Sequence, residues 1–203
     1  MGIENDLNIR IIIEMMIFVG APLLWWRVST KGDVWFFQWV GLERPAKKSQ
    51  CKFRVSLGIL FLYVLLALNI HALIFPNVII RDIYDNIPLG LLVISGIFNV
   101  VPFAVTMFFQ EIFFRGFIGK RLIDKLGFFR GNSVQALIYM IYFAILSGFD
   151  FIIAHSIYFL LLGTFGWLVG YVTEKQAGGS IIPAFITYTL AMYNSVFLYI
   201  LIR

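Results

Sequence analysis

Long runs of apolar residues, separated by short polar stretches, set the pattern of this chain. Because a helix needs about 20 apolar residues to cross a bilayer, we expect transmembrane helices at 9–26, 55–75, 88–101, 102–123, 134–149, 152–173 and 180–202. The third is an exception, because Asn99 and Pro102 break a run that is too short for two full crossings. We therefore predict an all-α, polytopic transmembrane helical bundle with about six spans and one short or re-entrant segment.

The composition supports a membrane protein. Hydrophobic residues make up 61% of the 203 residues, charged residues make up 13%, and the mean hydropathy is +0.89. Such a chain has too little polar surface to cover a soluble globule. Cys51 is the one cysteine, so no disulfide can form within the chain. We expect a single transmembrane domain over residues 1–203, and the sequence indicates neither a cofactor nor a metal.

The charged residues orient the predicted bundle. Seven bases and two acids lie between Arg27 and Arg54, and five bases and one acid between Arg115 and Arg130, so both stretches are predicted to face the cytoplasm. The stretch around Arg81 carries two acids and is predicted to lie outside. This alternation places both termini outside. Loops that face anionic lipid explain the net charge of +5, and we expect no nucleic-acid partner.

Two further patterns concern packing and membrane depth. The aromatic sequence WFFQWVGL at 35–42 is predicted to lie at the headgroup interface, where rings can be half wet. Gly166 and Gly170 share one helix face, so another helix can approach closely there, and we expect packing within the chain rather than dimerisation. Ser180 is expected to cap the helix that follows it.

The most unusual polar residues are Glu111 and Arg115, four residues apart in the apolar stretch FFQEIFFRGF. On a helix they share a face and can form an ion pair, which lowers the cost of burying either charge. Ionisable residues inside a membrane segment indicate either a functional site or a salt bridge that fixes neighbouring helices. These two residues alone do not decide between the two interpretations.

The neighbourhood of this pair resembles a known family. QEIFFRGFIGKRL, beginning at Gln110, is similar to the first motif of the CAAX protease and bacteriocin-processing family, the CPBP or Abi intramembrane proteins. In that motif two adjacent glutamates precede an Arg-Gly and a basic helix end. GLERP at 41–45 and FGWLVGYVTEKQAGGSIIPA at 165–184 also resemble family segments. The resemblance covers residues 35–200 and implies a protein of the prokaryotic cytoplasmic membrane.

Active members of this family cleave peptides inside the membrane, and the resemblance implies how. A glutamate takes a proton from water, while histidines and an asparagine orient the water and stabilise the oxyanion. The first glutamate of the motif is the usual base, and that position here holds Gln110. A glutamine can hold a water molecule by hydrogen bonds, but it cannot accept and return a proton. The resemblance therefore implies a degenerate site.

The family's second motif, a Phe followed four residues later by a His, can be aligned in two ways. Phe143 aligns if Ser147 takes the histidine position, whereas FIIAH at 151–155 aligns with His155 in that position. At about 1.5 Å per residue along each predicted helix, Ser147 lies level with Glu111 and His155 lies one turn too high. Depth therefore favours Ser147.

The third motif, a His followed four residues later by an Asn, also has two alignments. LAMYN at 190–194 keeps the asparagine, Asn194, and loses the histidine. The other register places Thr187 and Ala191 at these positions. Asn194 lies level with Glu111 by the same measure of depth, whereas Thr187 lies well below it. The predicted remnant site consists of Gln110, Glu111, Arg115, Ser147, Asn194 and His155.

Three functions remain open on the sequence. The first is a noncatalytic pseudoprotease that binds another membrane protein or peptide in the former substrate cleft, in bacteriocin immunity, in regulation or as a subunit of a larger membrane complex. The second is an active intramembrane CAAX-type endopeptidase that uses Glu111. The third is a small transporter or metal-binding membrane protein using His71, His155 and Glu111. Loss of the base and of both histidines favours the first.

Overall fold

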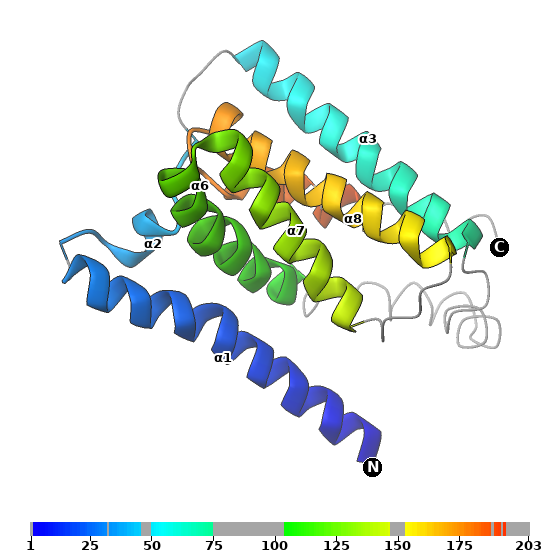
Figure 1. Ribbon diagram of the computed structural model, residues 1–203, viewed down its shortest axis with the longest axis horizontal. Helices are drawn as coiled ribbons and strands as arrows, with labels where there is room; N and C mark the ends of the chain where they lie inside the picture. Colours follow the sequence, from blue (N-terminus) through cyan, green and yellow to red (C-terminus); the bar gives the residue numbers. More distant parts are fainter. Residues whose placement is uncertain are drawn as a thin grey trace.

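The structure is a computed structural model that describes residues 2–31, 33–45, 50–74, 104–146, 153–187, 189–191 and 193 (Figure 1). The described part is helical. Its elements are α1 (Gly2–Thr30), α2 (Phe36–Trp39), α3 (Gln50–Ile74), the π-helix η1 (Ile112–Gly119), α6 (Lys120–Leu126), α7 (Phe128–Leu146), α8 (Ile153–Tyr171) and the π-helix η2 (Val172–Gln176). Residues 104–111 form an α-helix that runs directly into η1, and a further helix begins at Ile182.

These elements confirm the predicted all-helical class within the described residues. α1, α3, α7 and α8 each overlap a predicted crossing, and α1 extends beyond its predicted segment at both ends. Among the described helices, one is long and apolar enough to span a membrane: Ser156–Gln176, 21 residues with a mean hydropathy of 1.5. The segment 88–101 lies outside the described residues. The number of crossings therefore stays a prediction.

The centre of the bundle is the pair α7 and α8, with α3 on the far side of α8 (Figure 1). The predicted packing role of the glycines is confirmed within the chain. A Cβ on Gly166 would touch Ala136, and one on Gly170 would collide with the amide of Asn132, so the two helix backbones meet closely here. The hydroxyl of Tyr63 on α3 donates a hydrogen bond of 2.7 Å to the Leu161 carbonyl of α8.

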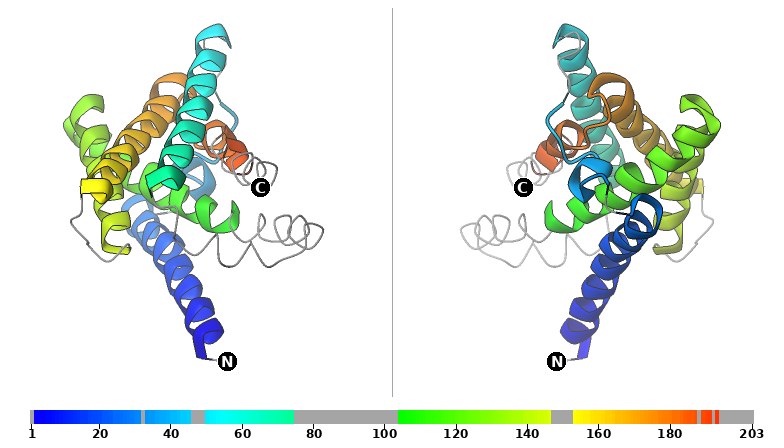
Figure 2. Two further views of the ribbon diagram at one scale, coloured as in Figure 1. Left: turned by 90° about the vertical axis from the view of Figure 1, so that its right-hand side faces the viewer. Right: turned by 90° about the vertical axis from the view of Figure 1, so that its left-hand side faces the viewer.

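α1 lies against η1, on the side of the molecule away from α3, and its N-terminal part points away from the bundle (Figure 2). The contact is aromatic. The ring of Phe18 lies 5.8 Å from that of Phe114 in η1, and Phe114 lies 5.1 Å from Tyr139 in α7. All three side chains are at most 4% exposed. This cluster fixes η1 between α1 and α7, and η1 carries the first of the predicted site motifs.

The aromatic segment predicted for the headgroup interface forms the short helix α2, which is bound to the body of the protein. The backbone N–H of Ile181 donates to the Gly41 carbonyl at 3.1 Å, and the Ser180 hydroxyl donates to the Glu43 carbonyl at 2.6 Å. The expected helix cap at Ser180 is therefore wrong, because this hydroxyl binds the α2 segment and the next helix begins at Ile182.

Candidate functional site

Gln110 and Glu111 end an α-helical turn, and the backbone then widens into the π-helix η1. The N–H of Lys120 bonds to the carbonyl of Arg115, five residues earlier, which is the hydrogen-bond pattern of a π-turn. Turns of this kind are rare and occur frequently at functional sites. Gly116 permits the arrangement, because a Cβ there would collide with the backbone of Val40. The motif therefore lies where the helix departs from regular geometry.

The predicted ion pair is present. Arg115 Nη1 lies 3.1 Å from Glu111 Oε1, and each of the two side chains is 1% exposed. Two charges removed from water in this way are tolerated only when they are paired, because the penalty for an unpaired buried charge is several kcal/mol. The carboxylate and the guanidinium therefore depend on each other.

Aromatic rings complete the surroundings of Arg115. Its guanidinium carbon lies 4.3 Å from the centre of the Tyr139 ring on α7 and 5.8 Å from the centre of the Phe165 ring on α8. A guanidinium over an aromatic face is stabilised by the negative potential of the ring, by about 2 kcal/mol where water is excluded. Arg115 therefore joins three helical elements: its own, α7 and α8.

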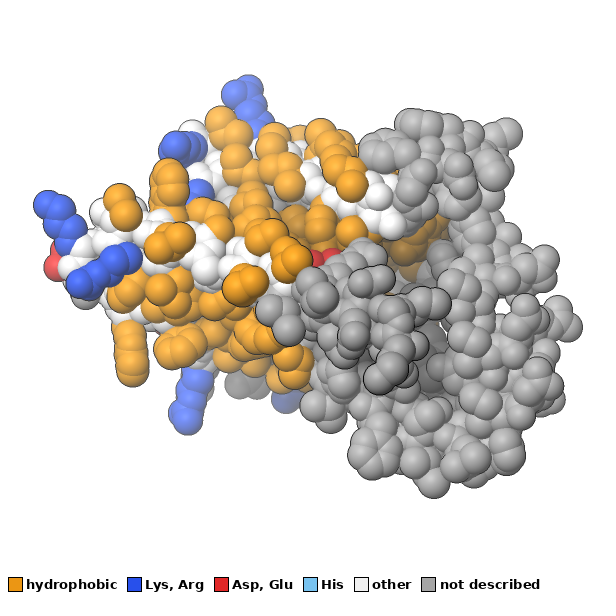
Figure 3. Space-filling model, turned by 90° about the horizontal axis from the view of Figure 1, so that it is seen from below, with side chains coloured by type: hydrophobic (Ala, Val, Ile, Leu, Met, Phe, Trp, Pro, Cys, Tyr) orange, Lys and Arg blue, Asp and Glu red, His pale blue; other side chains and the backbone are white. Residues whose placement is uncertain are grey.

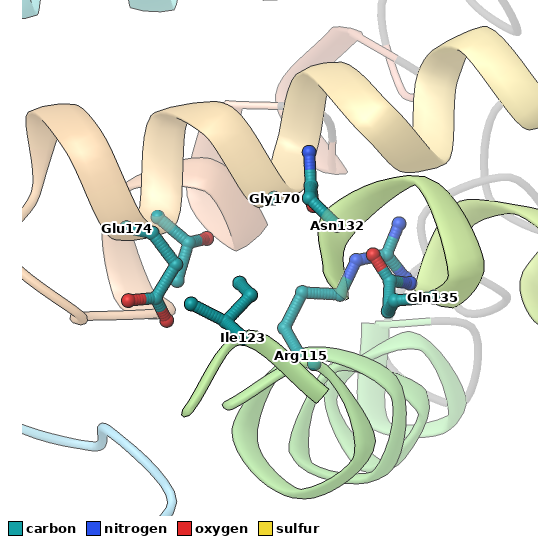
Figure 4. A pocket seen from close by; sticks show the side chains of 8 residues that line it. Arg115, Ile123, Asn132, Gln135, Gly170 and Glu174 are labelled. Carbon is teal, nitrogen blue, oxygen red and sulfur yellow. The ribbon is translucent and has the colours of Figure 1, made fainter. Parts of the chain in front are cut away.

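A narrow pocket, too tight to hold a water molecule and open on one side, lies on the other side of Arg115 (Figure 4). Its walls come from η1, α6, α7, α8 and η2. In Figure 4 the Arg115 side chain points toward Gln135, with Asn132 above it and Glu174 across the pocket. The lining residues are Arg115, Gly119, Ile123, Asn132, Gln135, Gly170, Thr173 and Glu174.

Five of the eight residues that line the pocket have polar or charged side chains, although the pocket lies between apolar helices. Asn132, Gln135 and Thr173 are each 1% exposed. Asn132 Nδ2 donates to the Trp167 carbonyl at 2.9 Å. Within the described part of the chain, no hydrogen-bond partner is found for Asn132 Oδ1, Gln135 Nε2 or Thr173 Oγ1. Sequence reasoning missed these residues, although Asn132 and Gln135 stand three apart in the helix α7, a spacing that puts two amides on one face.

Gln110 occupies the position that the family resemblance assigns to the catalytic base. Its side chain is buried, at 4% exposure, and the described residues offer no donor to its Oε1. The amide can accept a hydrogen bond from water or from a peptide N–H, but it cannot remove a proton. Chemically, the Gln110 amide can hold and orient a polar group, while the carboxylate next to it, that of Glu111, is paired with Arg115.

The remaining predicted site residues cannot be placed against this centre. Ser147 and Asn194 lie outside the described residues. His155 belongs to α8, but its side chain, like that of His71 on α3, is not among those described. No group of three potential metal ligands occurs within the residues that the structure describes. The grouping of Ser147, His155 and Asn194 around Glu111 therefore stays a prediction.

The alternative register of the third motif, with Thr187 and Ala191, falls on described residues. The Thr187 hydroxyl donates to the Pro183 carbonyl at 2.8 Å, so the helix's own backbone engages it. Ala191 is fully buried in an apolar cluster that includes Leu60 and Val169. Neither position has the surroundings of a group that would orient water. The choice between the two registers of the third motif stays a prediction.

The described residues form a helical bundle with one long apolar helix and with a buried ion pair beside a narrow pocket. A comparison with protein families matches residues 92–194 to the type II CAAX prenyl endopeptidase Rce1-like family. The match covers just over half of the chain, and the protein belongs to this family of integral membrane proteins. It ends at Asn194 and leaves out GLERP at 41–45. Neither the curated proteins nor the solved structures gave a match.

Proposed function

We propose that this protein is a noncatalytic member of its family, a membrane pseudoprotease that binds a peptide or a helix of another membrane protein. The observation that carries the proposal is the amide of Gln110 at the position of the base, next to a carboxylate that Arg115 already holds. General-base catalysis contributes roughly 10²- to 10⁴-fold to a rate. A site without that base would be a poor peptidase.

The same geometry supports binding. Gln110 presents a buried acceptor, Oε1, to which the described residues supply no donor. A buried amide gains most from a partner that satisfies it, because an unsatisfied polar group costs about 1–3 kcal/mol. The backbone N–H of an extended peptide, or of a helix end, is a group of the right kind. The family's substrates are peptides, so a bound peptide that is not cleaved is the simplest use of the former cleft.

We place this function in the cytoplasmic membrane, with about six crossings, the basic loops inside and both termini outside. Such a protein could serve in bacteriocin immunity, in regulation of a membrane partner or as a subunit of a larger complex. A second candidate, intramembrane endopeptidase activity, is favoured by one observation: Glu111 is a buried carboxylate one residue from the base position. For it to act as the base, Arg115 would have to release it.

Peptide cleavage in nanodiscs separates the two candidates. Quenched transmembrane and prenylated peptides are incubated with wild type, Gln110→Glu and Glu111→Ala, each checked for a folded monodisperse state. We expect no turnover by wild type and at most slow turnover by Gln110→Glu, because the histidines of the family motifs are lost as well. Turnover by wild type that Glu111→Ala abolishes would overturn the pseudoprotease proposal.

Partner binding is tested by cross-linking in the native membrane. A photo-reactive amino acid at Val105, which is 39% exposed on the helix that carries Gln110, is compared with the same group at Leu62 on α3, which is 59% exposed. A discrete protein or peptide adduct at Val105 that Gln110→Leu weakens is the expected result. Equal labelling at both positions, unaffected by Gln110→Leu, would argue against a specific partner.

A further inference from the structure

Among the side chains that the structure describes, the exposed charges gather at one end of the molecule (Figure 3). That end holds the end of α1, α2, the start of α3, α6, the start of α7 and η2. Among the described side chains, eight exposed bases lie there with three exposed acids, Asp33, Glu43 and Asp124. The bases, which we call the basic face, are Arg27, Lys31, Arg44, Lys52, Arg54, Lys125, Arg130 and Lys175.

The α2 segment, residues 34–43, is fixed rigidly at this end. Val40 is fully buried against Gly116 of the π-helix. Trp39 stacks on Phe117 at 5.9 Å, and the Arg121 guanidinium lies 3.7 Å from the centre of the Trp39 ring on α2. Together with the two hydrogen bonds from residues 180 and 181, these contacts attach the segment to η1, α6 and the loop after η2.

The opposite side of the α2 segment points outward and is aromatic. Trp35 is 66% exposed and Phe37 is 53% exposed, and Val34 beside them is also exposed. The Trp26 indole donates to the Val34 carbonyl at 2.7 Å, which fixes this surface to the end of α1. Exposed rings held rigidly beside a cluster of bases are typical of a surface that enters the headgroup layer of a membrane.

We propose that the α2 segment and the basic face form a binding surface for anionic phospholipid headgroups. Trp35 and Phe37 enter the interface, and the bases around them bind the phosphates. A lipid surface is favoured over an acidic protein because the end of α1 beside this surface also exposes large apolar side chains, those of Val28, Trp25 and Leu24. Each base close to an anionic surface contributes about 1 kcal/mol, which is roughly fivefold in binding.

This surface has a structural link to the site. Val40 contacts Gly116, the residue after Arg115, so the depth at which α2 meets the headgroups also fixes the depth of η1. A lipid-bound α2 would therefore hold Gln110 and Glu111 at a constant depth in the bilayer. This consequence does not depend on whether the site is catalytic.

Electron spin resonance of spin-labelled lipids tests the proposal in the purified, reconstituted protein. It measures the ratio of association constants for phosphatidylglycerol and phosphatidylcholine. We expect wild type to prefer the anionic lipid about fivefold, the contribution of one base. The triple variant Arg27→Gln, Lys31→Gln and Arg44→Gln, which leaves five bases of the basic face in place, should lower this ratio below that of wild type. About 1 M salt, which shortens the Debye length to roughly 3 Å, should have the same effect on wild type.

A matched variant removes two acidic charges from the same end of the molecule. Asp33→Asn with Glu43→Gln leaves the Glu43 carbonyl, and therefore the hydrogen bond from Ser180, in place. This variant should raise the preference for phosphatidylglycerol. Equal association of both lipids with wild type, or a preference that neither charge variant changes, would overturn the proposal and leave the basic face to an acidic protein partner.

Discussion

The buried ion pair gives the sharpest test of how this fold is held together. Arg115→Met keeps most of the side-chain volume and removes the charge, leaving Glu111 without its cation inside the bundle. Glu111→Leu removes the carboxylate and leaves Arg115 without its anion inside the bundle. The double variant removes both charges and leaves an apolar contact at the same place. The three variants together form a double-mutant cycle.

The expected loss of stability follows from the burial of the ion pair. Both side chains are 1% exposed, so breaking the pair by removing one partner should cost about 3–5 kcal/mol of unfolding free energy. Arg115→Met also loses the guanidinium contact with Tyr139. Replacing both charges by apolar groups removes the uncompensated charge, so the double variant should be destabilised by less than either single variant.

Unfolding in detergent micelles, followed by tryptophan fluorescence, measures these differences. At about 2–4 °C per kcal/mol for a chain of this length, each single variant should lower the midpoint by roughly 6–20 °C. Asp124→Asn is the matched control. It breaks the Arg121–Asp124 pair, 3.6 Å apart and with Asp124 71% exposed, and should cost at most about 1 kcal/mol. Single variants that behave like this control would refute the argument from burial.

Three other variants test neighbouring features by the same unfolding assay. Gly170→Ala should lower the free energy of unfolding by about 1–3 kcal/mol, because its Cβ would displace the Asn132 amide. Gly58→Ala is the control: its Cβ meets nothing within 4 Å, so it should stabilise α3 by about 0.5–1 kcal/mol. Equal effects would contradict the close contact of α7 with α8. Gly41→Ala places a Cβ at φ +83° against the Gly179 carbonyl and Lys120, and should detach α2, detected as faster tryptic cleavage after the exposed Lys31. Tyr139→Leu should cost about 2–4 kcal/mol, and combining it with Arg115→Met should cost less than the sum, since the guanidinium contact is then lost only once.

Part of this architecture could be predicted from spacing alone. Glu111 and Arg115 at i and i+4 predicted the ion pair, and Gly166 and Gly170 predicted a close helix contact inside the chain; both are confirmed. These features are local in sequence, so the 3.6-residue period of a helix is enough to derive them. The helical class followed from composition in the same way.

Other features depend on contacts that no local pattern contains. The π-helix after Glu111 packs, at Gly116, against the backbone of Val40, which lies about 75 residues earlier in the chain. The partner of the Ser180 hydroxyl, the Glu43 carbonyl, is 137 residues away. The pocket beside Arg115 draws polar side chains from α7 and η2, so their meeting depends on tertiary packing. The sequence showed that these residues were polar, but not that they met.

The proposed loss of catalysis is compatible with an unchanged fold. Arg115 contacts Glu111 in its own helix, Tyr139 on α7 and Phe165 on α8, so its removal would disturb three packed elements. Gln110, by contrast, is nearly isosteric with glutamate, and it fills the same buried volume without a charge that needs a partner. Replacing a base by its amide therefore costs the fold little, whereas replacing Glu111 or Arg115 costs several kcal/mol. In this protein, therefore, the presence of the Glu111–Arg115 pair does not by itself indicate catalysis, and the proposal of lost activity is tested at Gln110.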